Sequence, residues 1–309
     1  MTTTPLSRES HMDVSNTVDV TDPSAVGEAV RTLLETRYPG FDFSPVDVLI
    51  TDFARLYTGD YPGFKACDLK YHDLQHVLDV TVAMARLIEG HEMSHSAAEQ
   101  LGPEMALKGI ACALFHDSGY IRRNRDTRHS SGAAYTRTHV SRGARFMSEY
   151  FPTVGLAHFV PACQRLIHFT GYELNPDEIV SESAAERVLG TLLGTADLIA
   201  QMADADYLRK CRDYLYEEFE AGGMAGDGGE FSSAGVVYES PQHLLESTPN
   251  FIHEAITVRL DGYFKGAYRY ASQYFGGPNL YMDAIARNSA ELEKLLLEGQ
   301  LELAHPAPL

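Results

Sequence analysis

Two histidines and an aspartate at helical spacing are the first residues in this sequence that could support chemistry. In the stretch YHDLQHVLDV, His72, His76 and Asp79 occupy positions i, i+4 and i+7, which lie on one face of a helix. Apolar residues of the same stretch form an adjoining stripe that a core would cover. Two imidazoles at the edge of such a stripe could share a metal ion, or one could bind the metal while the other transfers a proton. Because the chain has 13 histidines, the spacing could also arise on an ordinary surface.

A second candidate lies where an apolar segment ends in a histidine and an aspartate. The stretch ACALFHDSGY predicts a helix that runs into His116 and Asp117 and stops at Gly119. A carboxylate buried without a partner is strongly unfavourable, so Asp117 must be hydrogen-bonded, ion-paired or bound to a metal. The apolar segment before it distinguishes this pair from His72 and Asp73.

The third candidate is Asp197, a carboxylate within an apolar helix. In VLGTLLGTADLIAQM it shares its side of the predicted helix with leucines and alanines. Taken alone, such an aspartate could cap a neighbouring helix or pair with an arginine. Together with the other two segments, the order His, His-Asp, Asp on three apolar helices favours a metal site.

Helices must position these groups, because apolar residues recur with a period near 3.6 from Val26 onward and no alternating strand pattern appears. The sequence therefore predicts an all-α fold. The glycine-rich stretch AGGMAGDGGE predicts a loop over about residues 221–249. We expect a flexible arm over residues 1–23, which are polar, and a single domain over residues 24–309. Helices are expected at roughly 24–37, 45–57, 72–89, 103–116, 139–150, 156–169, 183–203, 205–220, 249–275 and 281–298.

Composition limits the possible partners. The chain has 25 basic and 43 acidic residues, a formal net charge of −18, which disfavours binding to the backbone of a long nucleic acid. No apolar run is long enough to predict a membrane span. The four cysteines are far apart and form no Cys-x-x-Cys pair, so reduced thiols and a cytoplasmic location are expected. The sequence does not indicate an oligomeric state.

The ordered candidates resemble the metal sites of the HD-domain superfamily of metal-dependent phosphohydrolases. YHDLQHVLDV is also similar to the HN-x-x-H-x-x-D-V motif of class I cyclic nucleotide phosphodiesterases. The resemblance spans roughly residues 47–206 and implies an HD/PDEase-like helical bundle with two metal ions. It implies that Asp117 bridges the ions and that His72 donates a proton to the leaving oxygen. The implied ligands of the first ion are His76, His116, Asp117 and Asp197.

Two further histidines are implied as ligands of the second ion. They are His139, in HVSRG, and His168, in RLIHFTGY. Each has an alternative role, because His139 could be a polar residue at a helix start and His168 a hydrogen-bonded core histidine. Mixed imidazole and carboxylate ligation favours Mn or Fe and also accommodates Mg or Zn.

The implied activity is hydrolysis of a phosphomonoester or phosphodiester of a small molecule, with a nucleotide as the favoured class, by a metal-activated hydroxide. Two departures from the phosphodiesterase pattern, Asp73 in place of Asn and Tyr120 in place of His, leave a cyclic nucleotide unspecified. The segment IRRNRDTRH could bind a terminal phosphate, or it could be a surface loop paired with acids. The candidate phosphate-binding residues there are Arg122, Arg125 and Arg128.

Two other functions fit the same residues. The HD fold also contains di-iron oxygenases that use the same ordered ligands to activate O₂, and the ligand set alone does not separate them from hydrolases. A non-catalytic binding module stabilised by metal is the third hypothesis.

Overall fold

The computed structural model describes residues 8–226 and 237–299. This described part is all-α, as the hydrophobic period predicts, and contains isolated β-bridges but no strand. None of its helices is long and apolar enough to cross a membrane. The helices are α1 (Pro23–Arg37), α2 (Pro45–Thr58), α3 (Leu74–Ser94), α4 (Pro103–Phe115), α5 (His139–Tyr150), α6 (Val160–Leu166), α7 (Ala184–Met202), α8 (Tyr207–Lys210), α9 (Tyr216–Ala221), α10 (Pro241–Glu254), α11 (Tyr270–Phe275) and α12 (Leu280–Glu298).

Helix α3 is the central element of the fold. Of its 21 residues, 16 are buried, because α1, α4, α7 and α11 pack around it. Asp73 caps its N-terminus by accepting a hydrogen bond from the His76 backbone N–H at 2.9 Å. This cap fixes the point at which the first candidate motif enters the helix.

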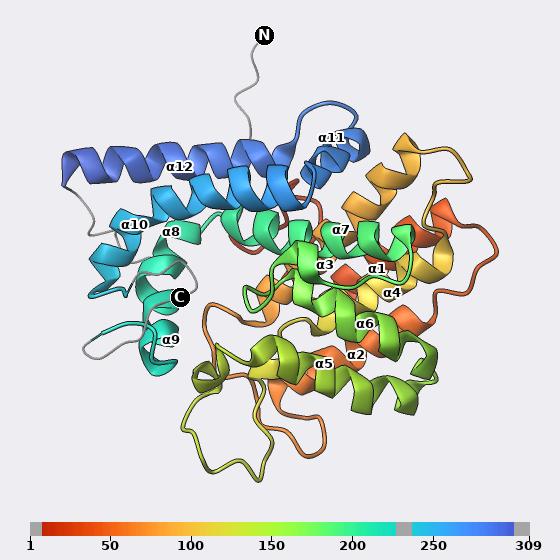
Figure 1. Ribbon diagram of the computed structural model, residues 1–309, viewed down its shortest axis with the longest axis horizontal. Helices are drawn as coiled ribbons and strands as arrows, with labels where there is room; N and C mark the ends of the chain where they lie inside the picture. Colours follow the sequence, from red (N-terminus) through yellow and green to blue (C-terminus); the bar gives the residue numbers. More distant parts are fainter. Residues whose placement is uncertain (1–7, 227–236, 300–309) are drawn as a thin grey trace.

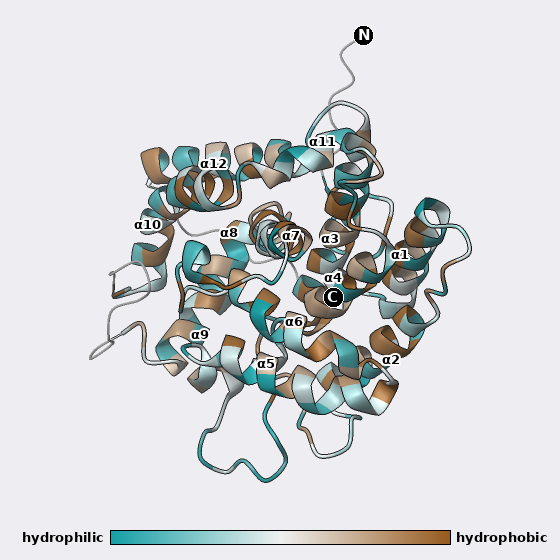
Figure 2. Ribbon diagram, turned by 45° about the vertical axis from the view of Figure 1, so that its right-hand side comes forward, coloured by the Kyte–Doolittle hydropathy of each residue, from teal (hydrophilic) through white to brown (hydrophobic). Residues whose placement is uncertain are grey.

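The other helices form layers around α3 and α7. Helices α10, α11 and α12 lie on one side, and α2, α5 and α6 lie on the other (Figure 1). Figure 2 shows α7 near the centre of the molecule with α3 beside it. Both helices contribute fully buried leucines to one continuous hydrophobic core. The buried polar residues on these two helices are therefore surrounded by this core.

The expectation of a flexible arm over residues 1–23 is wrong for residues 8–22. Asp13 and Val20 are fully buried there. The Asp13 carboxylate accepts hydrogen bonds from three backbone N–H groups and pairs with Arg86 at 2.7 Å. Arg8 pairs with Asp79 at 2.5 Å. Because these partners lie on α3, far along the chain, the polar composition of the segment did not reveal its packing. Residues 1–7 lie outside the described residues.

Two predicted boundaries also differ from the structure. The loop expected over about 221–249 ends earlier, because α10 begins at Pro241 with Ser240 as its N-cap; residues 227–236 lie outside the described residues. Pro249 lies inside α10 and does not terminate it. The helix expected over 249–275 is divided into the end of α10, a π-helical segment over Ala255–Tyr263, and α11.

Candidate metal centre

Three elements far apart in the sequence bring His76, His116 and Asp197 together. Each residue offers one ligand atom, and these atoms all lie within 4.8 Å of one another. The Oδ1 atom of Asp197 on α7 lies 3.4 Å from Nε2 of His76 on α3 and 3.7 Å from Nε2 of His116 at the end of α4. All three residues are buried. Two imidazoles and a carboxylate at this spacing form a group that could hold a divalent cation.

Asp117 faces this group with one oxygen and a further histidine with the other. Its Oδ2 atom lies 3.5 Å from Nε2 of His76 and 3.3 Å from Nε2 of His116. Its Oδ1 atom lies 3.8 Å from Nε2 of His139, the first residue of α5. The carboxylate therefore lies between the Nε2 atoms of His76 and His116 on one side and Nε2 of His139 on the other.

Backbone carbonyls orient two of the imidazole rings. Nδ1 of His116 lies 2.8 Å from the Ala113 carbonyl oxygen, and Nδ1 of His139 lies 2.7 Å from the Thr136 carbonyl oxygen. Because a carbonyl only accepts, each Nδ1 carries the hydrogen and donates it. Each Nε2 is then the lone-pair nitrogen of the neutral ring, which is the form that binds metal.

The electrostatics of the site favour a cation. Burial lowers the pKa of His116, but the neighbouring Asp117 carboxylate outweighs this and raises it to about 9. Burial raises the pKa of Asp117, and the histidines around it, His116 first, lower it well below its usual range. Burial lowers the pKa of His139. The buried Asp117 carboxylate has no arginine or lysine among these partners. It therefore requires positive charge, which a proton or a metal ion can supply.

Unsatisfied atoms give a test of whether the residues fit a metal. Nε2 of His116 and Oδ2 of Asp117 are buried and have no hydrogen-bond partner in the described part of the chain. Such atoms are costly in a protein interior unless something binds them. A divalent ion would use both as ligands, so the donor set fits a metal.

A close contact between η1 (Ser118–Tyr120) and α5 holds the two halves of the site together. A Cβ atom on Gly119 would lie 1.7 Å from the His139 carbonyl oxygen, so only glycine permits this approach. Gly119 lies two residues after Asp117. Because it has no side chain, α5 can place His139 beside Asp117.

His72 lies beside the metal-binding residues and is held by Glu218. The sequence predicted His72 inside a helix, but α3 begins at Leu74, so His72 precedes the Asp73 cap. Its ring nevertheless lies 5.9 Å from that of His76, centroid to centroid. Nδ1 of His72 lies 2.6 Å from Oε2 of Glu218. Burial lowers the pKa of His72, but the Glu218 carboxylate outweighs this and raises it to about 8.

Sequence reasoning missed two residues of this site. Glu218 on α9 is 146 residues from His72, and no local pattern connects them. Tyr120 was noted only as a departure from a motif, yet its ring stacks on His72 at 4.8 Å and on His139 at 4.4 Å. Its position three residues after Asp117 is the one signal that could have identified it.

The remaining candidates have other partners or are exposed. Nδ1 of His168 lies 3.9 Å from Oε2 of Glu173, and its role as a ligand stays a prediction. Arg122 pairs with Asp68 at 2.6 Å. Its loop extends away from the helices at the bottom of Figure 1, and Arg125 and Arg128 on that loop are exposed. Phosphate binding by these three arginines also stays a prediction.

Asp79, the third residue of the first motif, is paired with Arg8 and lies outside the metal-binding group.

Comparison with known protein families gives a match. A search of curated proteins finds no similar sequence. Residues 126–281 match the family described as Npun_R2479-like. The matched region contains His139, Asp197 and Glu218, whereas His76 and the His116-Asp117 pair precede it. Since the match covers half of the chain, this protein belongs to the Npun_R2479-like family.

Proposed function

We propose that this protein is a metal-dependent phosphohydrolase of the HD type that cleaves a phosphomonoester or phosphodiester of a small molecule, with a nucleotide as the favoured class. The convergence of His76, His116 and Asp197 on one buried point supports the proposal most strongly. Asp117 beside this group adds a further carboxylate ligand. The neighbouring His72 imidazole, which Glu218 holds, adds a proton donor for the leaving oxygen of a phosphate ester.

The geometry around Asp117 supports the proposed metal ligands. His76, His116, Asp117 and Asp197 would hold the first ion, and Asp117 with His139 would contribute to a second. Divalent ions bound there would supply Lewis acidity toward phosphate oxygens and lower the pKa of a bound water. Mn or Fe is favoured for this mixed set of nitrogen and oxygen donors.

His72 is proposed to supply the proton to the leaving oxygen. Glu218 accepts the Nδ1 hydrogen, so Nε2 is the nitrogen that can donate toward the site. With a pKa of about 8, a substantial share of His72 carries both protons near neutrality. After donation, Glu218 keeps the neutral ring in the tautomer with hydrogen on Nδ1, ready to be reprotonated at Nε2. The stacked Tyr120 ring limits rotation of the imidazole.

Metal analysis of natively purified protein tests the proposal, followed by an anaerobic screen of phosphomonoesters and phosphodiesters. We expect about two divalent ions per chain and release of phosphate or alcohol that chelation abolishes and Mn or Fe restores. Bound iron with O₂ consumption and no anaerobic hydrolysis would support an oxygenase instead. Bound metal without turnover of any ester would support the binding module.

A further inference from the structure

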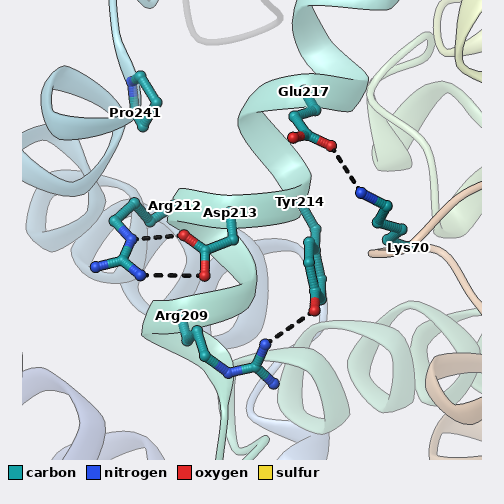
Figure 3. Close-up of a pocket in the computed structure, with 7 residues that line it drawn as sticks. All are labelled: Lys70, Arg209, Arg212, Asp213, Tyr214, Glu217 and Pro241. Carbon is teal, nitrogen blue, oxygen red and sulfur yellow. Dashed lines mark hydrogen bonds and ion pairs between the residues drawn. The ribbon is translucent and has the colours of Figure 1, made fainter. Parts of the chain in front are cut away.

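An open pocket lies next to the segments that carry and support His72. Its volume is about 540 Å³, within the range of roughly 300–1,000 Å³ typical of small-molecule sites. The segment before α3, the α8–α9 region and the start of α10 form its walls (Figure 3). Lys70, Arg209 and Arg212 all line this pocket, in a chain whose net charge is −18. Two acids, Asp213 and Glu217, line it as well, so the pocket has three cations against two acids in an otherwise acidic protein.

A π-helical segment shapes the wall. It covers Cys211–Leu215, between α8 and α9, and places Arg212, Asp213 and Tyr214 along the pocket. Short π-helical turns interrupt the regular α-helical spacing and are frequent at functional sites. Figure 3 shows Arg212 paired with Asp213, and Arg209 directed to the Tyr214 hydroxyl.

Two of the cations have donors that an anion could use. Lys70 pairs with Glu217 at 3.2 Å, but the two side chains are 61% and 63% exposed, so water screens this pair and an anion can displace it. Arg209 donates to the Tyr214 hydroxyl at 3.0 Å and to Asp206 at 2.8 Å. A guanidinium has five N–H donors, so the terminal nitrogens of Arg209 keep further donors beside these two. Ammonium and guanidinium donors together are the groups that bind phosphate oxygens.

The segment before α3 and helix α9 both line the pocket and hold His72. Lys70 is two residues before His72, so their Cα atoms can be no more than about 7 Å apart. The backbone N–H groups of Lys70 and Tyr71 both donate to Glu218 Oε1, at 2.9 and 2.6 Å. Glu217, the partner of Lys70, directly precedes Glu218. The pocket therefore lies beside the segment that carries His72, and a substrate that occupies both would extend along this segment.

We propose that this pocket binds a non-reacting phosphate of the substrate, which would make the substrate a small organic phosphate with a second anionic group, such as a nucleoside polyphosphate. The inference rests on the proposed function for the reacting end of that molecule. A free polyphosphate has the same chemistry, and the experiments below separate the two sources.

Calorimetric titration of metal-free, full-length protein with pyrophosphate tests the pocket without any need for activity. We expect binding that weakens at least tenfold in the double variant Lys70→Gln/Arg209→Gln, which removes the two cations argued to reach an anion. The matched control Arg145→Gln removes an arginine that is 79% exposed and lies outside the pocket, and should bind as the original protein does. Thermal melting checks that each variant is folded. Absence of binding at millimolar pyrophosphate, or equal binding by the folded double variant, overturns the proposal. It is also overturned if Arg125→Gln/Arg128→Gln removes the binding instead.

Kinetics of the metal-loaded protein identify the source of the phosphate. For a hydrolysed nucleoside polyphosphate, the double variant should raise KM at least tenfold, while KM for p-nitrophenyl phosphate, which has no second anion, stays unchanged. Binding of pyrophosphate with unchanged KM for both esters would overturn the substrate assignment and identify a separate polyphosphate ligand. Binding of pyrophosphate without hydrolysis of any ester would support the pocket and contradict the proposed function.

Discussion

At the scale of single residues, Asp117 is the side chain on which the proposed centre depends most. Its Oδ2 atom faces His76 and His116, and its Oδ1 atom faces His139. The proposed assignment gives each of the other ligands to one ion only. Removal of Asp117 should therefore affect both ions, whereas removal of His139 should affect one.

We expect Asp117→Asn to lose both metal ions and the hydrolytic activity, because a neutral amide neither balances the charge of two ions nor bridges them well. Metal content by mass spectrometry and activity after incubation with excess Mn are the measurements. The control is Asp73→Asn, which alters the other His-Asp pair and keeps a side chain that can cap α3. Retention of two ions by Asp117→Asn would show that the bridging assignment is wrong.

The histidines of the first motif should behave differently on substitution. His76→Ala should lose metal and activity, whereas His72→Ala should keep its metal and lose kcat by roughly 100-fold or more with alkyl phosphate esters. With p-nitrophenyl phosphate, whose leaving group needs no proton, the His72→Ala defect should shrink at least about tenfold, or about 1.4 kcal/mol of barrier. Equal defects on both ester types, or loss of metal from His72→Ala, would show that His72 is not the proton donor.

At the scale of elements, the site depends on how closely η1 approaches α5. A methyl group at Gly119 cannot fit against the His139 carbonyl, so the two elements must separate. The backbone of α5 carries His139, and η1 directly follows Asp117. Separation would lengthen the distance between these two side chains, which is 3.8 Å at closest.

Gly119→Ala should therefore lower the free energy of unfolding by about 1–3 kcal/mol and reduce the metal content from two ions toward one. Chemical denaturation and metal analysis measure the two effects. Gly277→Ala is the matched control, since nothing lies within 4 Å of its Cβ position and its backbone has no left-handed φ. An unchanged stability and full metal content in Gly119→Ala would mean that the contact adapts and does not position His139.

At the scale of the whole molecule, the N-terminal segment over residues 8–22 packs on α3 and forms buried ion pairs with it. Arg86 and Asp13 are nearly completely buried and lie 2.7 Å apart. Removal of one partner of a buried pair leaves an uncompensated charge, which costs about 3–5 kcal/mol. Asp47→Asn removes a carboxylate from an exposed pair with Arg31 and should cost no more than about 1 kcal/mol.

Asp13→Asn should thus destabilise the protein strongly near pH 7. Burial raises the pKa of Asp13, but Arg86 and the hydrogen bonds outweigh this, so the folded-state pKa lies well below the usual value of 3.8. A carboxyl with a depressed pKa adds stability above its unfolded-state pKa and loses it as the pH falls toward the folded-state pKa. The difference in unfolding free energy between Asp13→Asn and the original protein should therefore shrink below about pH 4. A difference that stays constant from pH 7 to pH 3 would contradict the ion-pair explanation.

The sequence by itself determined the all-α class, because the hydrophobic period of a helix is a local property. It predicted α5 with its observed bounds, His139–Tyr150, and most other helices within a few residues. It also identified His76, His116 and Asp197, since a polar group inside an apolar helix is visible without knowledge of its partners.

Only the tertiary structure decided which groups meet. Glu218 reaches His72 across 146 residues, and Arg8 reaches Asp79 across 71. Neither Glu218 nor Arg8 stands out in the sequence, because charged residues on helix surfaces and in polar segments are ordinarily solvated. The same holds for the pocket around Lys70 and Arg212, whose cations become neighbours only when α9 packs near the start of α3. Partner choice between distant charges depends on how helices pack, and packing is decided by the whole core, not by the residues around each charge.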